Sequence, residues 1–492
     1  MLERLKTLSI KGIAWSAGES AGVALFSLVV FTLLARILEP QHFGVVALAG
    51  VFVFTFNLIV GHSFADAIVQ RVSIDPDHAE TAFWTNLAIA LALAGMCFAG
   101  AGYAAERLGE PALAEILPWL SLVLPLNALG IVQMALFRRE AQFRAIALRS
   151  LLGRGVGGVV GVGMAFGGFG AWSLVGQQLS GSAVAALAMI VASPWRPRFR
   201  FSVLHLRQLW RFGFNVSASQ LIGGVGEQAL NLVVGSLLGS VALGYFNIAW
   251  RVTQLVRSLI GSAVYHVGFN AFSRLQENRD AAVRAFLQAT RLSCLFGFPI
   301  GAGLAILAGP FVVAMFGAKW ENSIALVAIF ALELFAAFYA MFFSACYRAM
   351  GKAAWTLWLS VLHVGTGVAA VMAVSPWGVR AVAAVWVAKS VLLLPVHLAL
   401  LRRLLGVKLA ALARPVGPPL AASALMATAL AATLAVAGGT VAPATLLLTA
   451  VPAGIAVYVA FIFAISPELL CIAARTARIM VAPEGASGAD RS

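Results

Sequence analysis

Seven ionisable residues lie inside long apolar stretches of this sequence, where charge is costly. Ionisable side chains in such stretches are rare, and they mark binding sites, proton pathways or buried ion pairs. Cations there bind anionic groups, and carboxylates balance the cations or carry protons. The seven residues are Glu19, Arg154, Glu227, Arg251, Arg257, Glu333 and Lys389.

Two neighbouring apolar stretches each carry a stripe of polar residues at helical spacing. Glu227 and Arg251 are each twelve residues from Gly239, and at 1.5 Å per residue both lie about 18 Å from that turn. Both are therefore expected near mid-membrane. The first stripe is Ser217, Gln220, Gly224, Glu227 and Asn231, and the second is Asn247, Arg251, Gln254, Ser258, Ser262 and Tyr265.

Two interpretations of these stripes remain open from the sequence. In the first, Glu227 and Arg251 form a buried pair that only fixes helix packing. In the second, the stripes line a central aqueous cavity that binds an anionic headgroup. The candidate residues of that cavity are Arg251, Arg257, Glu227, Asn231, Gln220, Gln254 and Lys389.

The composition shows which elements must position these residues. Hydrophobic residues make up 61% of the 492 residues and charged residues 11%, whereas soluble domains are about half apolar and a quarter charged. This excludes a soluble globular enzyme and a disordered protein, and only four cysteines exclude a disulfide scaffold. The apolar runs are continuous and not alternating, which favours membrane helices over a β-barrel.

Fourteen apolar runs approach or exceed the roughly 20 residues that a helix needs to cross a membrane. The predicted fold is therefore an all-α polytopic membrane protein with about 14 transmembrane helices. The predicted spans are 13–35, 43–65, 80–104, 113–137, 149–167, 171–192, 213–237, 241–266, 289–316, 322–348, 354–374, 378–400, 416–437 and 443–465.

The distribution of the basic residues predicts the orientation. Most of the 34 Lys and Arg residues fall on the side of the N-terminus, and only Arg36, Arg107, Lys319 and Arg380 fall on the other. The positive-inside rule then places both termini in the cytoplasm. The net charge of +15 therefore indicates contact with anionic membrane lipids, and no nucleic-acid partner is expected.

A weak internal repeat appears when the sequence is shifted by 200 residues. LLARILEPQHFGVVALA (33–49) then lies over VVGSLLGSVALGYFNIA (233–249), which aligns Gly44 with Gly244. Chance similarity between two hairpins remains an alternative, but the shift contains six spans, which predicts two parallel six-helix lobes. The predicted organisation is a first lobe at 1–192, a basic cytoplasmic linker at 193–210, a second lobe at 211–403, two extra spans at 404–467 and a cytoplasmic tail at 468–492.

Motifs for ATP hydrolysis or metal binding do not occur in the sequence. There is no Walker motif, no H-E-x-x-H and no metal-type Cys/His spacing. We therefore expect a protein that is not an enzyme and uses neither a cofactor nor a metal. Gly153, Gly157 and Gly161 form overlapping G-x-x-x-G patterns, which predict a close approach between two helices.

An ordered series of segments resembles a known family. The series is LLARILEPQHFG (33–44), GHSFADAIVQR (61–71), RFGF (211–214), VVGSLLGSVALGYFNIAWRV (233–252) and VGFNAFSRLQENRD (267–280). It is similar to the polysaccharide transporter family of the multidrug/oligosaccharidyl-lipid/polysaccharide exporter superfamily, the Wzx-type flippases, with colanic acid exporter-like members. Several members carry Asp on the seventh span where this chain has Glu227.

The resemblance implies a flippase of the bacterial inner membrane. It would move an undecaprenyl-pyrophosphate-linked oligosaccharide from the cytoplasmic to the periplasmic leaflet, for exopolysaccharide, capsule or lipopolysaccharide. Its two lobes would alternate between inward-open and outward-open states, and a polymerase and a chain-length regulator would be partners. Since the sequence has no ATPase motif, the driving force would be an ion gradient or consumption of the product by polymerisation. Glu19, Glu227 and Glu333 are the candidate carriers of a coupling proton, because burial favours the protonated form of a carboxylate.

Four other classes of protein fit the sequence less well than this hypothesis. A purely structural membrane scaffold is poorly motivated, given seven buried ionisable residues. An ion-coupled multidrug antiporter usually has twelve spans and a carboxylate-rich cavity, whereas four of the seven intramembrane ionisable residues here are basic. A lipid II flippase shares fourteen spans and a cationic cavity, but the quoted segments fit the polysaccharide group better. A membrane glycosyltransferase or ligase needs large periplasmic loops, which the predicted topology lacks.

Overall fold

The computed structural model describes residues 22, 26–62, 64–70, 75–273, 279–437 and 441–468. Within these ranges, the side chains of residues 62, 66, 70, 209–223, 225, 227, 259–273, 279, 281, 282 and 353 lie outside the description. The described part of the chain is built from helices. Twelve segments of it are long and apolar enough to cross a membrane. The predicted all-α polytopic membrane fold is thereby confirmed.

The chain divides into two compact units. The first comprises Met1–Asn247 with Val368–Val379. Its helices begin with Phe26–Ile37. They continue with α2 (Pro40–His62), α3 (Ala65–Gln70), α4 (Pro76–Leu108), α5 (Ala112–Ser121), α6 (Val123–Arg139), α7 (Phe143–Phe166), α8 (Ala171–Ala192) and the larger part of α9 (Val203–Ser273).

The second unit comprises Ile248–Gly367 with Arg380–Ser492. It contains the end of α9 and most of α14 (Ala353–Val374) and α15 (Val379–Leu392). The short helix η2 (Ser375–Trp377) follows α14 in the sequence and belongs to the first unit. The other helices of the second unit are α10 (Arg279–Ile306), α11 (Ala308–Phe316), η1 (Ala318–Ser323), α12 (Ile324–Ala340), α13 (Phe343–Ala349), α16 (Leu394–Leu405), α17 (Leu409–Ala413), α18 (Gly417–Ala437) and α19 (Pro443–Ile465).

Most predicted spans coincide with observed helices. The span predicted at 13–35 falls largely on residues outside the described part of the chain. The spans predicted at 213–237 and 241–266 correspond to α9, whose apolar window is Gln228–Ser258. Gly239 interrupts α9 with φ 84° and ψ 170°, a backbone conformation that only glycine adopts readily. The turn predicted at this glycine is therefore present.

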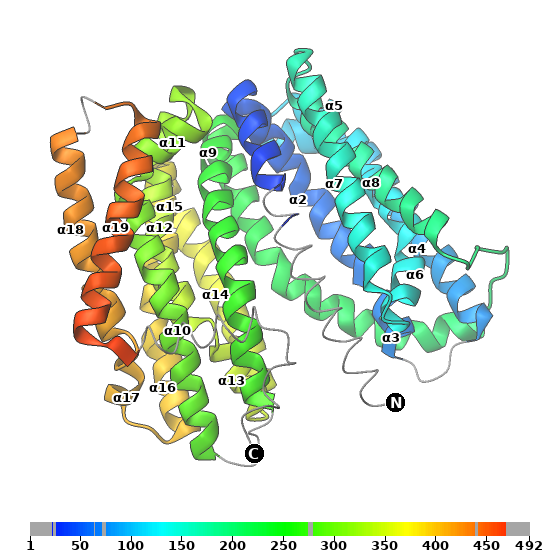
Figure 1. The fold of residues 1–492 in the computed structure, drawn as a ribbon. Helices are drawn as coiled ribbons and strands as arrows, with labels where there is room; N and C mark the ends of the chain where they lie inside the picture. Colours follow the sequence, from blue (N-terminus) through cyan, green and yellow to red (C-terminus); the bar gives the residue numbers. More distant parts are fainter. Residues whose placement is uncertain are drawn as a thin grey trace, which may run out of the picture. The chain divides into compact units, whose positions relative to one another are not determined.

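Glycines bring α7 and α8 into close contact, and Figure 1 shows the two helices side by side. A β-carbon at Gly157 would lie 2.6 Å from the carbonyl oxygen of Gln177, and one at Gly153 would lie 2.8 Å from that of Gly181. Such distances leave no room for a side chain, so the predicted close helix approach is confirmed.

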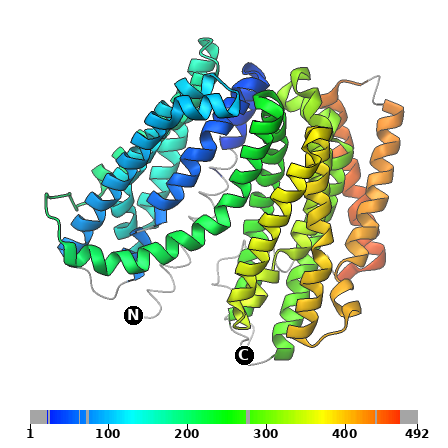
Figure 2. The ribbon, with the colours of Figure 1, turned by 180° about the vertical axis from the view of Figure 1, so that it is seen from behind.

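The last two spans pack within the second unit. Helices α18 and α19 run side by side in both views (Figure 1 and Figure 2). The hydroxyl of Tyr458 on α19 donates a hydrogen bond of 2.8 Å to the carbonyl of Leu295 on α10. Met426 on α18 packs in the same buried cluster. The expected C-terminal helix pair is thus fixed to α10, while the predicted lobe limits 1–192 and 211–403 stay predictions.

Two aligned positions of the internal repeat contact each other's counterparts within the first unit. A β-carbon at Gly44 would overlap the carbonyl oxygen of Ser240, and one at Gly244 would overlap that of Pro40. Pro40 and Ser240 are 200 residues apart, as are Gly44 and Gly244. This reciprocal contact is what a two-fold relation between repeats produces, and it supports the repeat over chance similarity.

Candidate functional site

Three of the ionisable residues singled out in the sequence lie in one cluster of the second unit. Arg257 comes from α9, Glu333 from α12 and Lys389 from α15. The structure adds His363 from α14 and Trp386 from α15. These five residues are called the membrane cluster below.

Arg257 and Glu333 form the ion pair of this cluster. Nη1 of Arg257 lies 3.5 Å from Oε1 of Glu333. The Glu333 side chain is 8% exposed, whereas that of Arg257 is 38% exposed. The carboxylate is therefore held inside the helix bundle while the guanidinium keeps an open side. A partly open cation of this kind can bind a second anion.

Lys389 is buried, and its ammonium group contacts neutral groups of the protein. Its Nζ lies 3.0 Å from Nε2 of His363 and donates to the His363 carbonyl at 3.1 Å. The ammonium also sits 3.4 Å from the centre of the Trp386 ring, a cation–π contact. A β-carbon at Gly367 would lie 2.7 Å from this Nζ, so the glycine provides the space for it. Because an ammonium only donates, His363 accepts through a neutral imidazole.

Aromatic rings connect the two cations. Trp250 on α9 packs edge-on against Phe330 at 5.3 Å and against Trp386 at 6.1 Å between ring centroids. Phe330 precedes Glu333 by one helical turn. The Glu333 carboxylate also acts electrostatically on the Lys389 ammonium. The rings therefore join the helices α9, α12 and α15, which carry the charged residues of the cluster.

Three members of the cluster lie deep in their spans, and the cluster as a whole carries a net positive charge. Glu333, His363 and Lys389 are at least nine residues from either end of the segments Ala318–Ala349, Ala354–Trp377 and Val379–Leu405. At 1.5 Å per residue this is roughly 13 Å or more. Two cations, one carboxylate and a neutral imidazole leave an excess of one positive charge. Such a charge at membrane depth attracts an anionic group.

The other predicted site residues have varied positions. Arg251 is exposed on α9, whereas Asn231 and Gln254 are half-buried there. Glu19 and the side chains of Gln220 and Glu227 lie outside the described residues, so the pairing of Glu227 with Arg251 stays a prediction.

Two members of the cluster were not selected from the sequence. His363 lies inside the predicted span 354–374, and counting histidines among the ionisable residues would have identified it. Trp386 lies three residues before Lys389, which places the two on one helix face. The sequence carries both signals but does not show which faces of α14 and α15 meet.

Comparisons with known proteins agree with this architecture. A family model described as "Polysaccharide biosynthesis protein" matches residues 33–325. The chain is 31% identical over 323 residues to the succinoglycan biosynthesis transport protein ExoT of Rhizobium meliloti, covering 66% of this chain and 65% of that protein. It is 25% identical to the lipopolysaccharide biosynthesis protein WzxC of Escherichia coli, with 65% of each chain covered. The similarity thus spans about 65% of the length of these relatives.

Solved structures with low sequence identity share the fold. The lipid II flippase MurJ in an inward-closed conformation matches with a TM-score of 0.76 and 13% identity, covering 93% of this chain and 100% of that one. An inward-facing multidrug resistance MATE family transporter of the MOP superfamily matches with a TM-score of 0.63 and 18% identity, covering 81% of this chain and 99% of that one. At such identities the likeness concerns the fold alone.

Proposed function

Because the chain belongs to the polysaccharide biosynthesis protein family, whose model matches residues 33–325, we propose that it moves a lipid-linked sugar unit across a bacterial inner membrane. The substrate would be an undecaprenyl-pyrophosphate-linked oligosaccharide, passed from the cytoplasmic to the periplasmic leaflet. Relatives named for succinoglycan transport and lipopolysaccharide biosynthesis support a role in surface polysaccharide assembly.

The observation that carries this proposal is the excess positive charge at mid-span. The pyrophosphate linker is an anion that must cross a medium in which isolated charge is costly. Lys389 is bound by neutral partners, so its charge remains available to compensate an incoming anion. The indole N–H of Trp386 is buried and has no hydrogen-bond partner among the described residues. It is a further donor for a phosphate or sugar oxygen.

Polar residues on α9 extend this proposal. Asn231 lies before the break at Gly239 in α9, and Arg251 and Gln254 lie after it. With Gln220 and Glu227 they are the candidate residues of a polar wall along which the headgroup would pass. The lipid tail would stay in the bilayer. Two lobes that alternate in access would expose this wall to each side in turn.

The driving force would come from an ion gradient or from consumption of the product by a polymerase. The sequence contains no Walker motif for ATP hydrolysis. Among Glu19, Glu227 and Glu333, only Glu333 has a described side chain, and it pairs with Arg257. A buried carboxylate in an ion pair can take up and release a proton, so Glu333 is a candidate proton carrier together with Glu19 and Glu227.

Complementation of a deletion strain tests the transport proposal. We expect the deletion to abolish surface polysaccharide and to leave lipid-linked sugar units in the cytoplasmic leaflet. The wild-type gene restores export, whereas Lys389→Gln lowers it at least about tenfold, a barrier increase of about 1.4 kcal/mol. The measurement compares labelled lipid-linked units that are accessible from the periplasm.

Two further variants serve as controls. Lys389→Arg keeps the charge and is expected to retain part of the export. Lys352→Gln removes an exposed cation at the turn before α14 and is expected to export normally. Normal polysaccharide in the deletion strain, together with new sensitivity to cationic drugs, would reject the flippase and favour the multidrug antiporter.

A further inference from the structure

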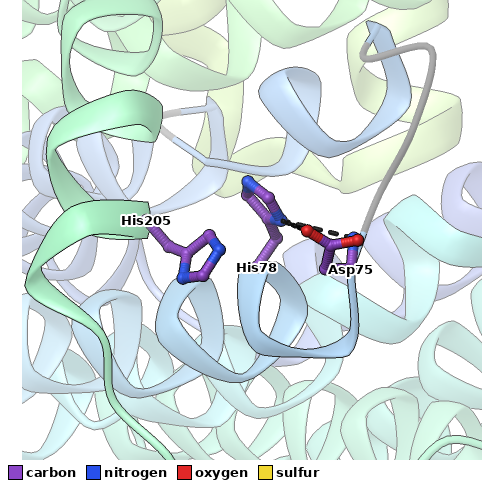
Figure 3. A group of neighbouring side chains, drawn as sticks. All are labelled: Asp75, His78 and His205. Carbon is purple, nitrogen blue, oxygen red and sulfur yellow. Dashed lines mark hydrogen bonds and ion pairs between the residues drawn. The ribbon is translucent and has the colours of Figure 1, made fainter.

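Asp75, His78 and His205 gather where two helices begin, away from the membrane cluster. Asp75 and His78 lie at the start of α4, and His205 lies in the first turn of α9. One ligand atom from each of the three lies within 4.8 Å of the others. Figure 3 shows His78 between the carboxylate of Asp75 and the ring of His205. Two imidazoles and a carboxylate are a common ligand set for borderline transition metals.

The hydrogen bonds of His78 orient it as a metal ligand. Its Nε2 lies 3.1 Å from Oε1 of Gln208, and an amide oxygen only accepts, so Nε2 carries the proton. Nδ1 then holds the lone pair of the ring, which accepts the backbone N–H of Asp75 at 3.3 Å, so a metal ion bound at Nδ1 would replace this long hydrogen bond. That nitrogen lies 3.8 Å from Oδ2 of Asp75. Ligating histidines commonly donate their second N–H to an oxygen in this way.

His205 provides a second, independent observation. Its Nδ1 is buried and has no hydrogen-bond partner among the described residues. Buried polar atoms in proteins are nearly always satisfied, so an orphaned ring nitrogen needs an explanation. The His205 and His78 rings meet edge to face with centroids 4.2 Å apart, and one ring nitrogen of His205 lies within 4.8 Å of the ligand atoms of Asp75 and His78. A cation bound at Nδ1 would satisfy that nitrogen.

The surroundings hold the two helix starts together and add negative charge. The side chain of Trp84 donates to the carbonyl of Arg198 at 2.7 Å, and the backbone N–H of Ser202 donates to Thr81. The buried carboxylate of Glu80 accepts from the backbone N–H of Arg198. These contacts fix the segment before α9 on the first turns of α4. Arg200 pairs with Asp77 at 3.8 Å, a further contact between the two segments. A metal ion would therefore bind on a frame that is already fixed.

We propose that Asp75, His78 and His205 bind a transition-metal ion of the zinc class, which clips the start of α9 to α4. In bound zinc sites, ligands lie about 2.0–2.2 Å from the metal. Closure from the observed spacing needs a small movement of the exposed Asp75 side chain and of the His205 ring. The ion would hold the first part of α9, the helix that continues from the first unit into the second.

Metal binding to the purified full-length chain tests this site. The protein is prepared with a histidine-free tag, stripped with chelator and dialysed against Zn²⁺. We expect one Zn²⁺ more per wild-type chain than per His205→Phe chain, and an affinity at least about tenfold higher. Phenylalanine keeps the edge-to-face ring contact, so this variant removes the ligand while retaining the packing. Zn²⁺ should also raise the unfolding temperature of the wild type only.

His42 provides a matched control. Its Nδ1 accepts the backbone N–H of Glu39 at 3.3 Å, the same arrangement as in Asp75 and His78. His42→Gln is expected to leave the Zn²⁺ stoichiometry unchanged. Co²⁺ added to the wild type should give a visible absorption band of nitrogen and oxygen ligands that Zn²⁺ removes, and this readout needs no variant. Equal Zn²⁺ binding by wild type and His205→Phe, or no Co²⁺ band, would overturn the proposal.

Discussion

The Arg257–Glu333 pair shows how one residue contact combines stability with a proposed transport role. The carboxylate is buried and the guanidinium is 38% exposed. A pair that is open to solvent on one side contributes only about 0.5–1 kcal/mol, since solvent screens part of the attraction. Its position in the membrane cluster is therefore better explained by function than by a large stabilising energy.

A double-mutant cycle separates these two roles. We expect Glu333→Gln and Arg257→Gln each to lower the stability, and the double variant to lose less than the sum, with a coupling of about 0.5–1 kcal/mol. The measurement is thermal unfolding in detergent. Additive losses would show that the two side chains do not interact in the protein.

The proton-carrier role makes a distinct prediction for the same carboxylate. In cells, export by the wild type should fall when a protonophore collapses the proton gradient. Residual export by Glu333→Gln should not respond, because glutamine cannot take up a proton. If Glu333→Gln remains as sensitive as the wild type, the pair serves packing or substrate binding, and the coupling proton uses another group.

The contact between α7 and α8 depends on where glycine leaves the helix surface without a side chain. On α7, Gly153, Gly157 and Gly161 face α8, whereas Gly155 and Gly163 have no atom within 4 Å of an added β-carbon. Of these five glycines, three pack against α8 and two have no neighbour. Because both kinds lie on α7, alanine substitutions at the two kinds can be compared in the same helix.

The prediction for α7 follows from this difference. Gly157→Ala places a methyl group 2.6 Å from the carbonyl of Gln177, and the helices must separate, at a cost of about 1–3 kcal/mol. Gly155→Ala meets no neighbour and should be neutral or stabilising by up to about 1 kcal/mol, because alanine favours helix. Thermal unfolding of the two variants compares them directly. Similar behaviour of both would mean that α7 and α8 do not pack through this face.

The elements also show what the sequence predicts and what it leaves open. Apolar length alone identified spans such as 171–192 and 443–465, which match α8 and α19. It did not reveal interruptions such as the break at Leu122 between α5 and α6, because those residues remain apolar across the break. Counting residues from the turn at Gly239 predicted Arg251 as a mid-membrane cation. The structure instead shows an ion pair between Arg257 and Glu333. Which helix faces meet is a tertiary property that spacing along one chain does not encode.

At the scale of the whole molecule, the internal repeat is visible as a reciprocal contact. Gly44 meets Ser240 while Gly244 meets Pro40, and each contact joins a helix backbone to a carbonyl. The sequence identity between the two copies is low, yet the shift of 200 residues places these four residues in equivalent pairs. Such a close approach between two backbones requires glycine at both positions, since any side chain would separate the helices.

The reciprocal contact predicts that alanine at either glycine lowers the free energy of unfolding by a similar amount. Gly44→Ala and Gly244→Ala should each destabilise the protein by about 1–3 kcal/mol, because a methyl group would overlap a backbone carbonyl that no rotamer change can move aside. Gly50→Ala on α2 meets no atom within 4 Å and serves as the control, with no loss expected. Thermal unfolding and the yield of folded protein measure all three. If one glycine tolerates alanine while the other does not, the two contacts are unrelated, and the hairpins resemble each other by chance. Equal losses would instead mean that both copies of the repeat retain the same close packing between helix backbones.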